Sequence, residues 1–186
     1  MIKICIFFSF VFLFSSQIFC QDTVYSDEKH YYKIVKYYNI NNVEYALFSR
    51  YPDYLIYKTS PEYTKIVSID KVLEVDSLAL EFVKKQKTEL YQGYDDCPII
   101  KDNWANYCRQ VICYLEKKGR RTYDEIIRIQ YIHNSEIVRF KDDYELYGTF
   151  ETDFKKTWIS VSGGCSFYFN IYYNVNKGKI VDFVVN

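Results

Sequence analysis

The chain has 186 residues, with 24 Lys and Arg against 24 Asp and Glu, so its formal charge at neutral pH is zero. This balance argues against a strongly basic nucleic-acid-binding protein, and we expect no nucleic-acid partner. Tyrosine is abundant, with 21 residues, whereas the six glycines leave little room for a glycine-rich phosphate or dinucleotide loop.

The first twenty residues have the layout of a secretory signal peptide. Lys3 is followed by an apolar run from Ile4 to Phe14, and a cleavage position follows Cys20. The run is too short to cross a bilayer, which takes about 20 apolar residues, so we expect no transmembrane segment. The sequence therefore predicts a signal peptide over residues 1–20 and a single secreted or periplasmic domain over residues 21–186.

We do not expect a lipid anchor at Cys20. A bacterial lipoprotein has a small residue directly before the modified cysteine and an aliphatic residue three positions before it. Those positions hold Phe19 and Gln17.

Short strands are predicted at the start of the domain. Residues 31–38 are rich in β-forming types, residues 39–42 read as a turn, and residues 43–50 alternate apolar and polar side chains. A third short strand is predicted over residues 54–58.

Two helices are predicted in the middle of the chain. Asp76 can cap a helix over residues 77–91, which Gly93 follows. A second helix is predicted over residues 103–118, because its apolar residues follow helical spacing and Gly119 comes directly after it. These residues are Trp104, Cys108, Val111, Ile112 and Leu115.

The last third of the chain is predicted to be β again, with strands near residues 127–131, 137–140, 144–150 and 157–162 and a final hairpin. The apolar faces of that hairpin coincide if Ile171 pairs with Val181 and Phe169 with Phe183, around a loop that contains Gly178. Strands, then helices, then strands predict an α+β fold, with two helices packed on a mainly antiparallel sheet.

Four cysteines remain after residue 20, and an even number in an exported chain favours two disulfides. On the predicted helix, Cys108 faces the core and Cys113 faces outward, whereas Cys165 lies on the core face of its strand. The faces therefore favour the pairs Cys108–Cys165 and Cys97–Cys113. Cys97–Cys108 is easier to reach along the chain and remains an alternative.

Few residues suggest catalysis. His133, before a turn and close to Glu136, is the only histidine well placed to act as a base, since His30 lies near the expected mature N-terminus. Ser162 precedes two glycines but does not stand in a nucleophile-elbow motif. No spacing of cysteines and histidines suits a metal, so we expect neither a metal nor a cofactor.

One face of the final hairpin carries Tyr168, Asn170 and Tyr172, beside Asp182 on the closing strand. Aromatic rings with an amide and a carboxylate are suited to a flat surface that binds a sugar or a peptide. The same tyrosines also suit packing beneath another element.

The leading hypothesis is a small exported, non-enzymatic protein that binds an unknown protein, peptide or glycan. The alternatives are a small secreted hydrolase that uses His133 and nearby acids, and an inhibitor or immunity protein that acts against an exported enzyme.

Overall fold

The structure is a computed structural model that describes residues 18–26, 32–49, 64–86, 96–138, 154–155, 158–159, 161 and 163–186. The strands are β1 (Ile18–Ser26), β2 (Tyr32–Ile40), β3 (Val43–Phe48), β4 (Thr64–Lys65), β5 (Tyr107–Lys117), β6 (Tyr123–His133), β7 (Tyr168–Asn174) and β8 (Lys179–Val185). The helical elements are α1 (Ile69–Lys84), the short 3₁₀ turns η3 (Ile100–Asp102), η4 (Trp104–Asn106) and η5 (Cys165–Phe167), and residues 134–138.

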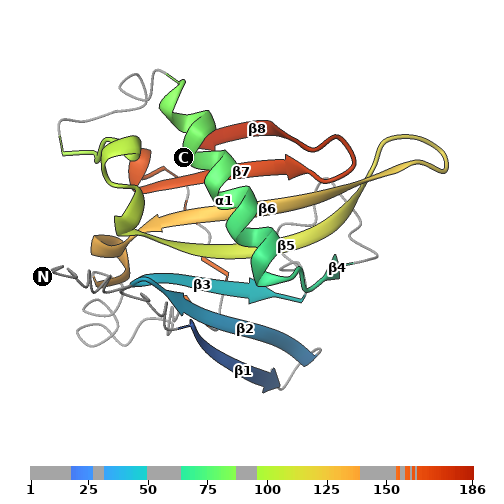
Figure 1. Cartoon of the computed structure of the whole chain (residues 1–186), viewed down its shortest axis with the longest axis horizontal. Coiled ribbons are helices and arrows are strands. Elements are labelled where there is room, and N and C mark those ends of the chain that lie inside the picture. Colours follow the sequence, from blue (N-terminus) through green and yellow to red (C-terminus); the bar gives the residue numbers. More distant parts are fainter. Residues whose placement is uncertain are drawn as a thin grey trace, which may run out of the picture.

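All of these strands belong to one sheet, in the order β1-β2-β3-β5-β6-β7-β8, with β4 beside β5 (Figure 1). Every pair is antiparallel except β3 and β5, which are parallel, and α1 lies in the long connection between them. The predicted α+β class, with a mainly antiparallel sheet in one domain, is confirmed.

The hairpin of β2 and β3 confirms the first two predicted strands. Asn41 and Asn42 form its turn with φ angles of 52° and 65°, a left-handed conformation that asparagine tolerates well. β1 pairs with β2 and includes Ile18 to Cys20, so it crosses the position where signal-peptide cleavage is predicted.

Helix α1 begins eight residues before the predicted helix, at Ile69 instead of residue 77. Its N-cap is Ser68, whose hydroxyl accepts a hydrogen bond from the Lys71 N–H. The prediction that Asp76 caps the helix is wrong, because Asp76 lies inside the helix and is buried against the sheet.

The predicted helix over residues 103–118 is also wrong, since most of this segment is strand β5. β5 is buried on both faces along most of its length, with Val111 and Cys113 toward α1 and Cys108 and Ile112 toward the other face.

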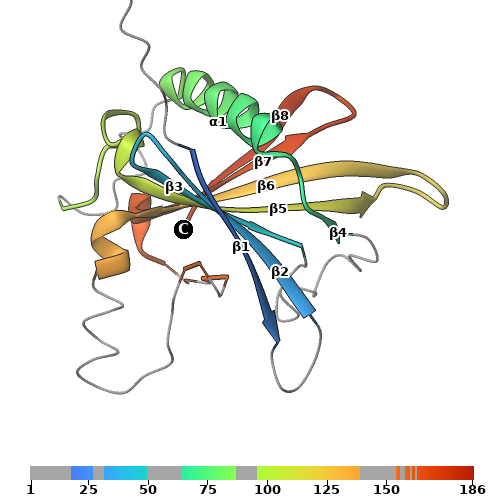
Figure 2. The ribbon, with the colours of Figure 1, turned by 60° about the horizontal axis from the view of Figure 1, so that its bottom comes forward.

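The core has two layers, one on each face of the sheet. On the face toward α1, the helix packs through residues with helical spacing, all fully buried: Val72, Val75, Ala79 and Val83. Four described side chains pack against the opposite face (Figure 2): Phe154, Trp158, Ile159 and Val161. Two buried glutamines bind the backbone of these residues: Gln110 donates to the Phe154 carbonyl at 2.7 Å and Gln130 to the Ile159 carbonyl at 2.6 Å.

The final hairpin forms as predicted but in a different register. Phe169 pairs with Val185 and Ile171 with Phe183, two residues away from the predicted pairing. The turn contains Gly178 in the predicted left-handed conformation, with φ of 62°. Next to the turn, Tyr173 pairs with Ile180, and a bulge on β8 then shifts the pairing by one residue. Ile171 therefore pairs with Phe183 instead of Asp182, and the apolar faces of the two strands coincide.

Other predicted strands differ from the structure or lie outside it. Residues 134–138 are helical, so the strand predicted over 137–140 is wrong in its described part. The strands predicted over 54–58 and 144–150 lie outside the described residues. Of the strand predicted over 157–162, residues 158, 159 and 161 are described, and none of the three lies in a strand.

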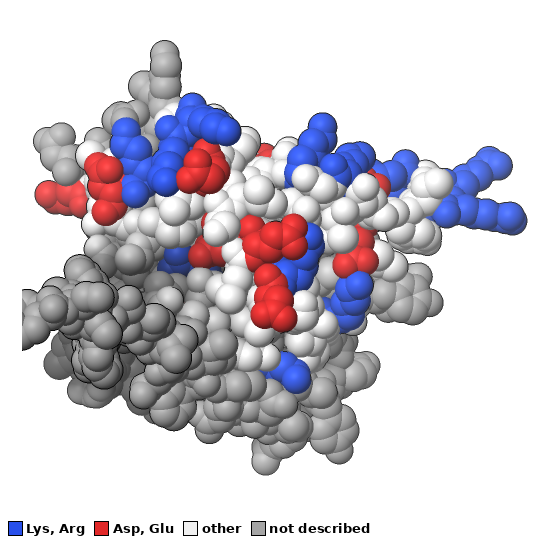
Figure 3. Space-filling model, viewed as in Figure 1, with Lys and Arg blue, Asp and Glu red and all other residues white. Residues whose placement is uncertain are grey.

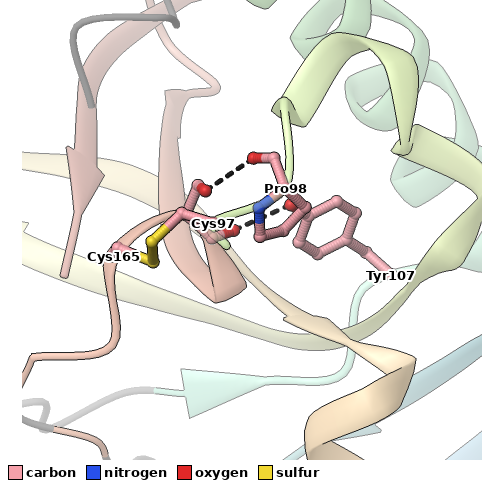
Figure 4. Close-up of a disulfide and its surroundings, with 5 residues drawn as sticks. Cys97, Pro98, Tyr107 and Cys165 are labelled. Carbon is pink, nitrogen blue, oxygen red and sulfur yellow. Dashed lines mark hydrogen bonds between the residues drawn. A yellow bond between two sulfur atoms is a disulfide. The ribbon is translucent and has the colours of Figure 1, made fainter. Parts of the chain in front are cut away.

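Both predicted disulfides are wrong, because Cys97 is bonded to Cys165 while Cys108 and Cys113 are free thiols. The disulfide joins the segment before η3 to the start of η5 (Figure 4). Two hydrogen bonds hold the same junction: Ser166 Oγ donates to the Pro98 carbonyl at 2.6 Å, and the Tyr107 hydroxyl donates to the Ser166 carbonyl at 2.7 Å.

Candidate functional site

Two of the four residues predicted to form a binding surface are buried. Tyr168 is 1% exposed, and its hydroxyl donates to Glu136 Oε2 at 2.7 Å. Asn170 is 3% exposed, and its Oδ1 accepts from Arg128 Nε at 2.9 Å. The residues do not form the flat exposed surface that the sequence predicted, because Phe154, Trp158 and Ile159 pack with Tyr168 on this face of the sheet.

The other two predicted residues remain at the surface, paired across β7 and β8. Tyr172 is half-buried, and its ring centre lies 5.4 Å from the Arg128 guanidinium carbon, which also lies 5.1 Å from the Trp158 ring. Asp182 is exposed, and its Oδ1 accepts from the Phe183 backbone N–H at 2.9 Å. Together they place an aromatic ring and a carboxylate beside the outer strand of the sheet.

That outer strand, β8, carries exposed apolar side chains. Val181 is 45% exposed and Val184 is 39% exposed, and in the described part of the chain β8 pairs only with β7 (Figure 1). Phe183 and Val185, by contrast, pack against the core under α1. β8 is therefore an edge strand. Phe183 and Val185 pack one of its faces against the core, whereas Val181 and Val184 are exposed to the solvent.

The hydrogen bonding of the last residue shows which backbone groups of β8 face outward. The Asn186 N–H donates to the Tyr168 carbonyl at 3.1 Å, which places Asn186, and by alternation Val184, in positions bonded to β7. Val185, between them, directs its N–H and C=O toward the outer edge. The Phe183 N–H, the next outward group by the same alternation, donates to the Asp182 carboxylate.

His133 acts as a helix cap in this structure. It directly precedes the helical residues 134–138, and its Nδ1 accepts from the Ser135 backbone N–H at 3.4 Å and lies 2.8 Å from Ser135 Oγ. Its ring packs edge-on against Tyr107 and Phe167. Nε2 is buried, with no hydrogen-bond partner among the described residues. Burial lowers the pKa of His133, and the nearby Glu136 opposes this shift.

The two free cysteines lie on opposite faces of β5 and are poor nucleophiles. Burial, with Glu44 close by, raises the pKa of Cys108 to about 12. Burial and Glu125 raise the pKa of Cys113 to about 12. Both thiols are therefore protonated at neutral pH and shielded from reagents.

Sequence reasoning missed a small cavity beside Cys113. Its volume is about 210 Å³, and an ion pair between Lys65 Nζ and Glu125 Oε1, 2.8 Å apart, forms part of its wall. The lining residues come from β4, β5 and β6: Thr64, Lys65, Cys113, Tyr114, Leu115 and Glu125. No motif signals it, because the cavity depends on the pairing of β4 with β5.

No known protein family, curated protein or solved structure matches the chain. Within the described ranges, no three acidic, histidine or cysteine residues are grouped so that they could hold a metal ion. The helices in these ranges are also too short or too polar to cross a membrane.

Proposed function

We propose that the chain is an exported, non-enzymatic interaction protein that binds an extended segment of another protein along β8. The observation that carries this proposal is the pair of exposed valines, Val181 and Val184, on an edge strand whose other side is anchored in the core. The signal-peptide pattern of residues 1–20 and the Cys97–Cys165 disulfide support export.

An edge strand of this kind favours binding by strand addition. A partner strand gains backbone hydrogen bonds from the outward groups of Val185, and its alternate side chains contact the two valines. Asp182 and Tyr172 lie at the same edge and supply polar contacts that set the register of the partner. An inhibitor or immunity protein is one member of this class of interaction proteins.

Site-specific photocrosslinking tests this proposal. Benzoylphenylalanine is placed at position 184 of the full chain, in the cells that normally make it, and adducts are identified by mass spectrometry. The control position is Leu78, which is 42% exposed on α1 and so presents a similar apolar side chain on a different surface. We expect one discrete protein adduct from position 184 and none from position 78.

An edge-blocking variant makes the test specific to strand addition. Val184→Lys places a charge where a partner strand would pack, and we expect it to abolish the adduct formed by a crosslinker at position 181. Leu78→Lys should leave that adduct unchanged. Equal adducts from positions 184 and 78, or none from either, would contradict the proposal.

A further inference from the structure

The most concentrated charge in the described part of the molecule lies at the tip of the β5–β6 hairpin. Four cations surround Gly119, and all four are exposed; we call them the basic tip: Lys117, Lys118, Arg120 and Arg121. The hairpin is built from two strands of 11 residues each. Figure 3 shows these side chains as a blue projection at one end of the molecule.

The basic tip extends beyond its neighbours in the sheet. The turn after β7 is held level with Glu125, because the Val175 N–H donates to the Glu125 carbonyl at 2.9 Å and the Glu125 N–H to Asn176 Oδ1 at 2.7 Å. From Glu125 to Tyr123, where β6 begins, the strand advances about 7 Å further, and the turn that carries Arg120 and Arg121 lies beyond it. The tip therefore reaches past the β7–β8 turn (Figure 1).

Most of the positive charge of the tip is uncompensated. The acids at the base of the hairpin are already paired: Glu116 with Lys118 at 2.6 Å, Asp124 with Lys177 at 3.0 Å, and Glu125 with Lys65 at 2.8 Å. Among the described residues, Lys117, Arg120 and Arg121 form no ion pair. Lys177 and Lys179 extend the positive surface from the tip toward the β7–β8 turn.

We propose that the basic tip binds an acidic polysaccharide, through its carboxylate or sulfate groups. The positive charge continues from the basic tip to Lys177 and Lys179, which suits a linear chain that carries repeated negative charges. Arginine binds carboxylate and sulfate in a two-pronged geometry, and Tyr123, 44% exposed beside the tip, offers a ring for stacking on a sugar.

Two other polyanions fit less well. A membrane-binding segment combines cations with several apolar side chains that enter the bilayer, whereas Tyr123 is the one such side chain in residues 117–123. Nucleic-acid-binding domains are usually basic as a whole, whereas this chain has no net charge and a pI of about 6.7. This inference concerns a surface separate from the β8 edge, so it stands or falls independently of the proposed function.

The test measures binding of the purified protein to heparin and to polygalacturonate, with neutral dextran as a reference, over a range of salt concentrations. The variant is Arg120→Gln/Arg121→Gln. The control is Lys84→Gln/Lys85→Gln, which removes the same charge from exposed positions at the end of α1. Since all four side chains are exposed, we expect both variants to keep the melting temperature of the wild type.

We expect the arginine variant to lose at least tenfold in affinity for one of the two acidic polysaccharides, and the control to lose less than twofold. The salt dependence of binding should also become shallower in the arginine variant, because fewer counterions are released. Equal losses in the two variants, or no wild-type binding at low salt, would overturn the proposal. Tighter binding to vesicles with anionic lipid, or to a single-stranded oligonucleotide, would overturn it too.

Discussion

At the scale of single residues, the most demanding feature is a buried ion pair between α1 and the sheet. Arg109 Nε lies 3.3 Å from Asp76 Oδ1, and the Arg109 side chain is 1% exposed. Asp76 also accepts from the Tyr131 hydroxyl at 2.8 Å and the Tyr45 hydroxyl at 3.0 Å. Arg109 Nη2 donates to the Trp104 carbonyl at 3.0 Å. Each charge is thus compensated by several partners.

Breaking this pair should cost far more than removing an exposed one. Asp76→Ala leaves the Arg109 charge buried without its carboxylate, so we expect a loss of about 3–5 kcal/mol in the free energy of unfolding, measured by chemical denaturation. The matched control is Glu74→Ala on the same helix, which removes an exposed pair with Lys71 and should change stability by less than about 1 kcal/mol. Similar losses in both variants would contradict the role assigned to Asp76.

Sequence reasoning could not predict this network. Asp76 precedes a run of helix-forming residues, so its type suggested a cap, and only the pairing of α1 with the sheet reveals its partner 33 positions away. Ser68 before Ile69 was the available signal for the true start of the helix, with Asp70 in the first turn.

His133 should make stability depend on pH. Its pKa is lowered in the folded protein, so between the folded value and the ordinary value of about 6.5 the unfolded chain binds more protons. The neutral ring therefore makes its full contribution to the free energy of unfolding above about pH 6.5, and this contribution is lost as the pH falls below that value. Protonation of Nδ1 also ends its acceptance of the Ser135 N–H.

The variant His133→Asn separates this effect from the titration of carboxylates. Asparagine keeps a capping oxygen but has no proton to gain, and Glu136 is present in both proteins. We expect the melting temperature of the wild type to fall more steeply between pH 7 and pH 5 than that of the variant. Parallel curves for the two proteins would exclude the predicted contribution of His133.

At the scale of elements, β5 shows why the sequence predicted a helix. A strand with both faces buried lacks the alternation of apolar and polar residues that identifies an exposed strand. Arg109 and Gln110 are polar but buried, which concealed the pattern further. The β-forming residues Val111, Ile112 and Tyr114 were the better signal. By contrast, β3 and β6 were predicted correctly.

The hairpin of β7 and β8 was predictable in its pairing but not in its register. The common apolar face of Phe169, Ile171, Phe183 and Val185 is present, and the left-handed glycine lies in the turn. The bulge inserts one residue on β8, and the sequence carries no marker for it. The burial of Tyr168 agrees with the alternative that the tyrosines pack beneath another element, but the sequence did not show that Phe154, Trp158 and Ile159 would pack there.

Two adjacent glycines lead into η5 and β7, and they should respond differently to alanine. Gly163 has φ of 84° with no atom within 4 Å of an added Cβ, so Gly163→Ala should cost about 1–2 kcal/mol from backbone strain alone. An added Cβ at Gly164, with φ of 104°, would lie 2.8 Å from Tyr168 Cδ2.

The Tyr168 ring cannot move away easily, because it is buried and its hydroxyl is bonded to Glu136. We therefore expect Gly164→Ala to lose a further 1–3 kcal/mol, roughly, relative to Gly163→Ala in urea unfolding. Equal free energies of unfolding for the two alanine variants would indicate that the Tyr168 ring does not restrict position 164.

At the scale of the whole molecule, the disulfide between Cys97 and Cys165 joins parts that lie far apart in the sequence. Cys97 precedes the segment that leads into β5, and Cys165 precedes β7, with a sequence separation of 68. The sequence favoured other pairs because it assigned Cys108 and Cys113 to a helix, whereas on β5 they point to opposite faces of the sheet. The number of cysteines alone could not choose among the pairings.

The disulfide should contribute about as much to stability as the buried ion pair of Asp76 and Arg109. On the chain-entropy model, closing a loop of this length stabilises the fold by about 4 kcal/mol, so Cys97→Ser/Cys165→Ser should lose about that much in guanidinium unfolding.

Thiol labelling and peptide mapping distinguish this pairing from the others. In the protein that begins at Gln21, we expect no rapid alkylation in the native state, because burial raises the pKa of both free cysteines to about 12. Denaturation without reductant should release two reactive thiols, Cys108 and Cys113, and a non-reducing digest should contain one cross-linked peptide pair, Cys97 with Cys165. Four thiols released without reductant would mean that the disulfide is absent, and none would mean two disulfides with a different arrangement of β5.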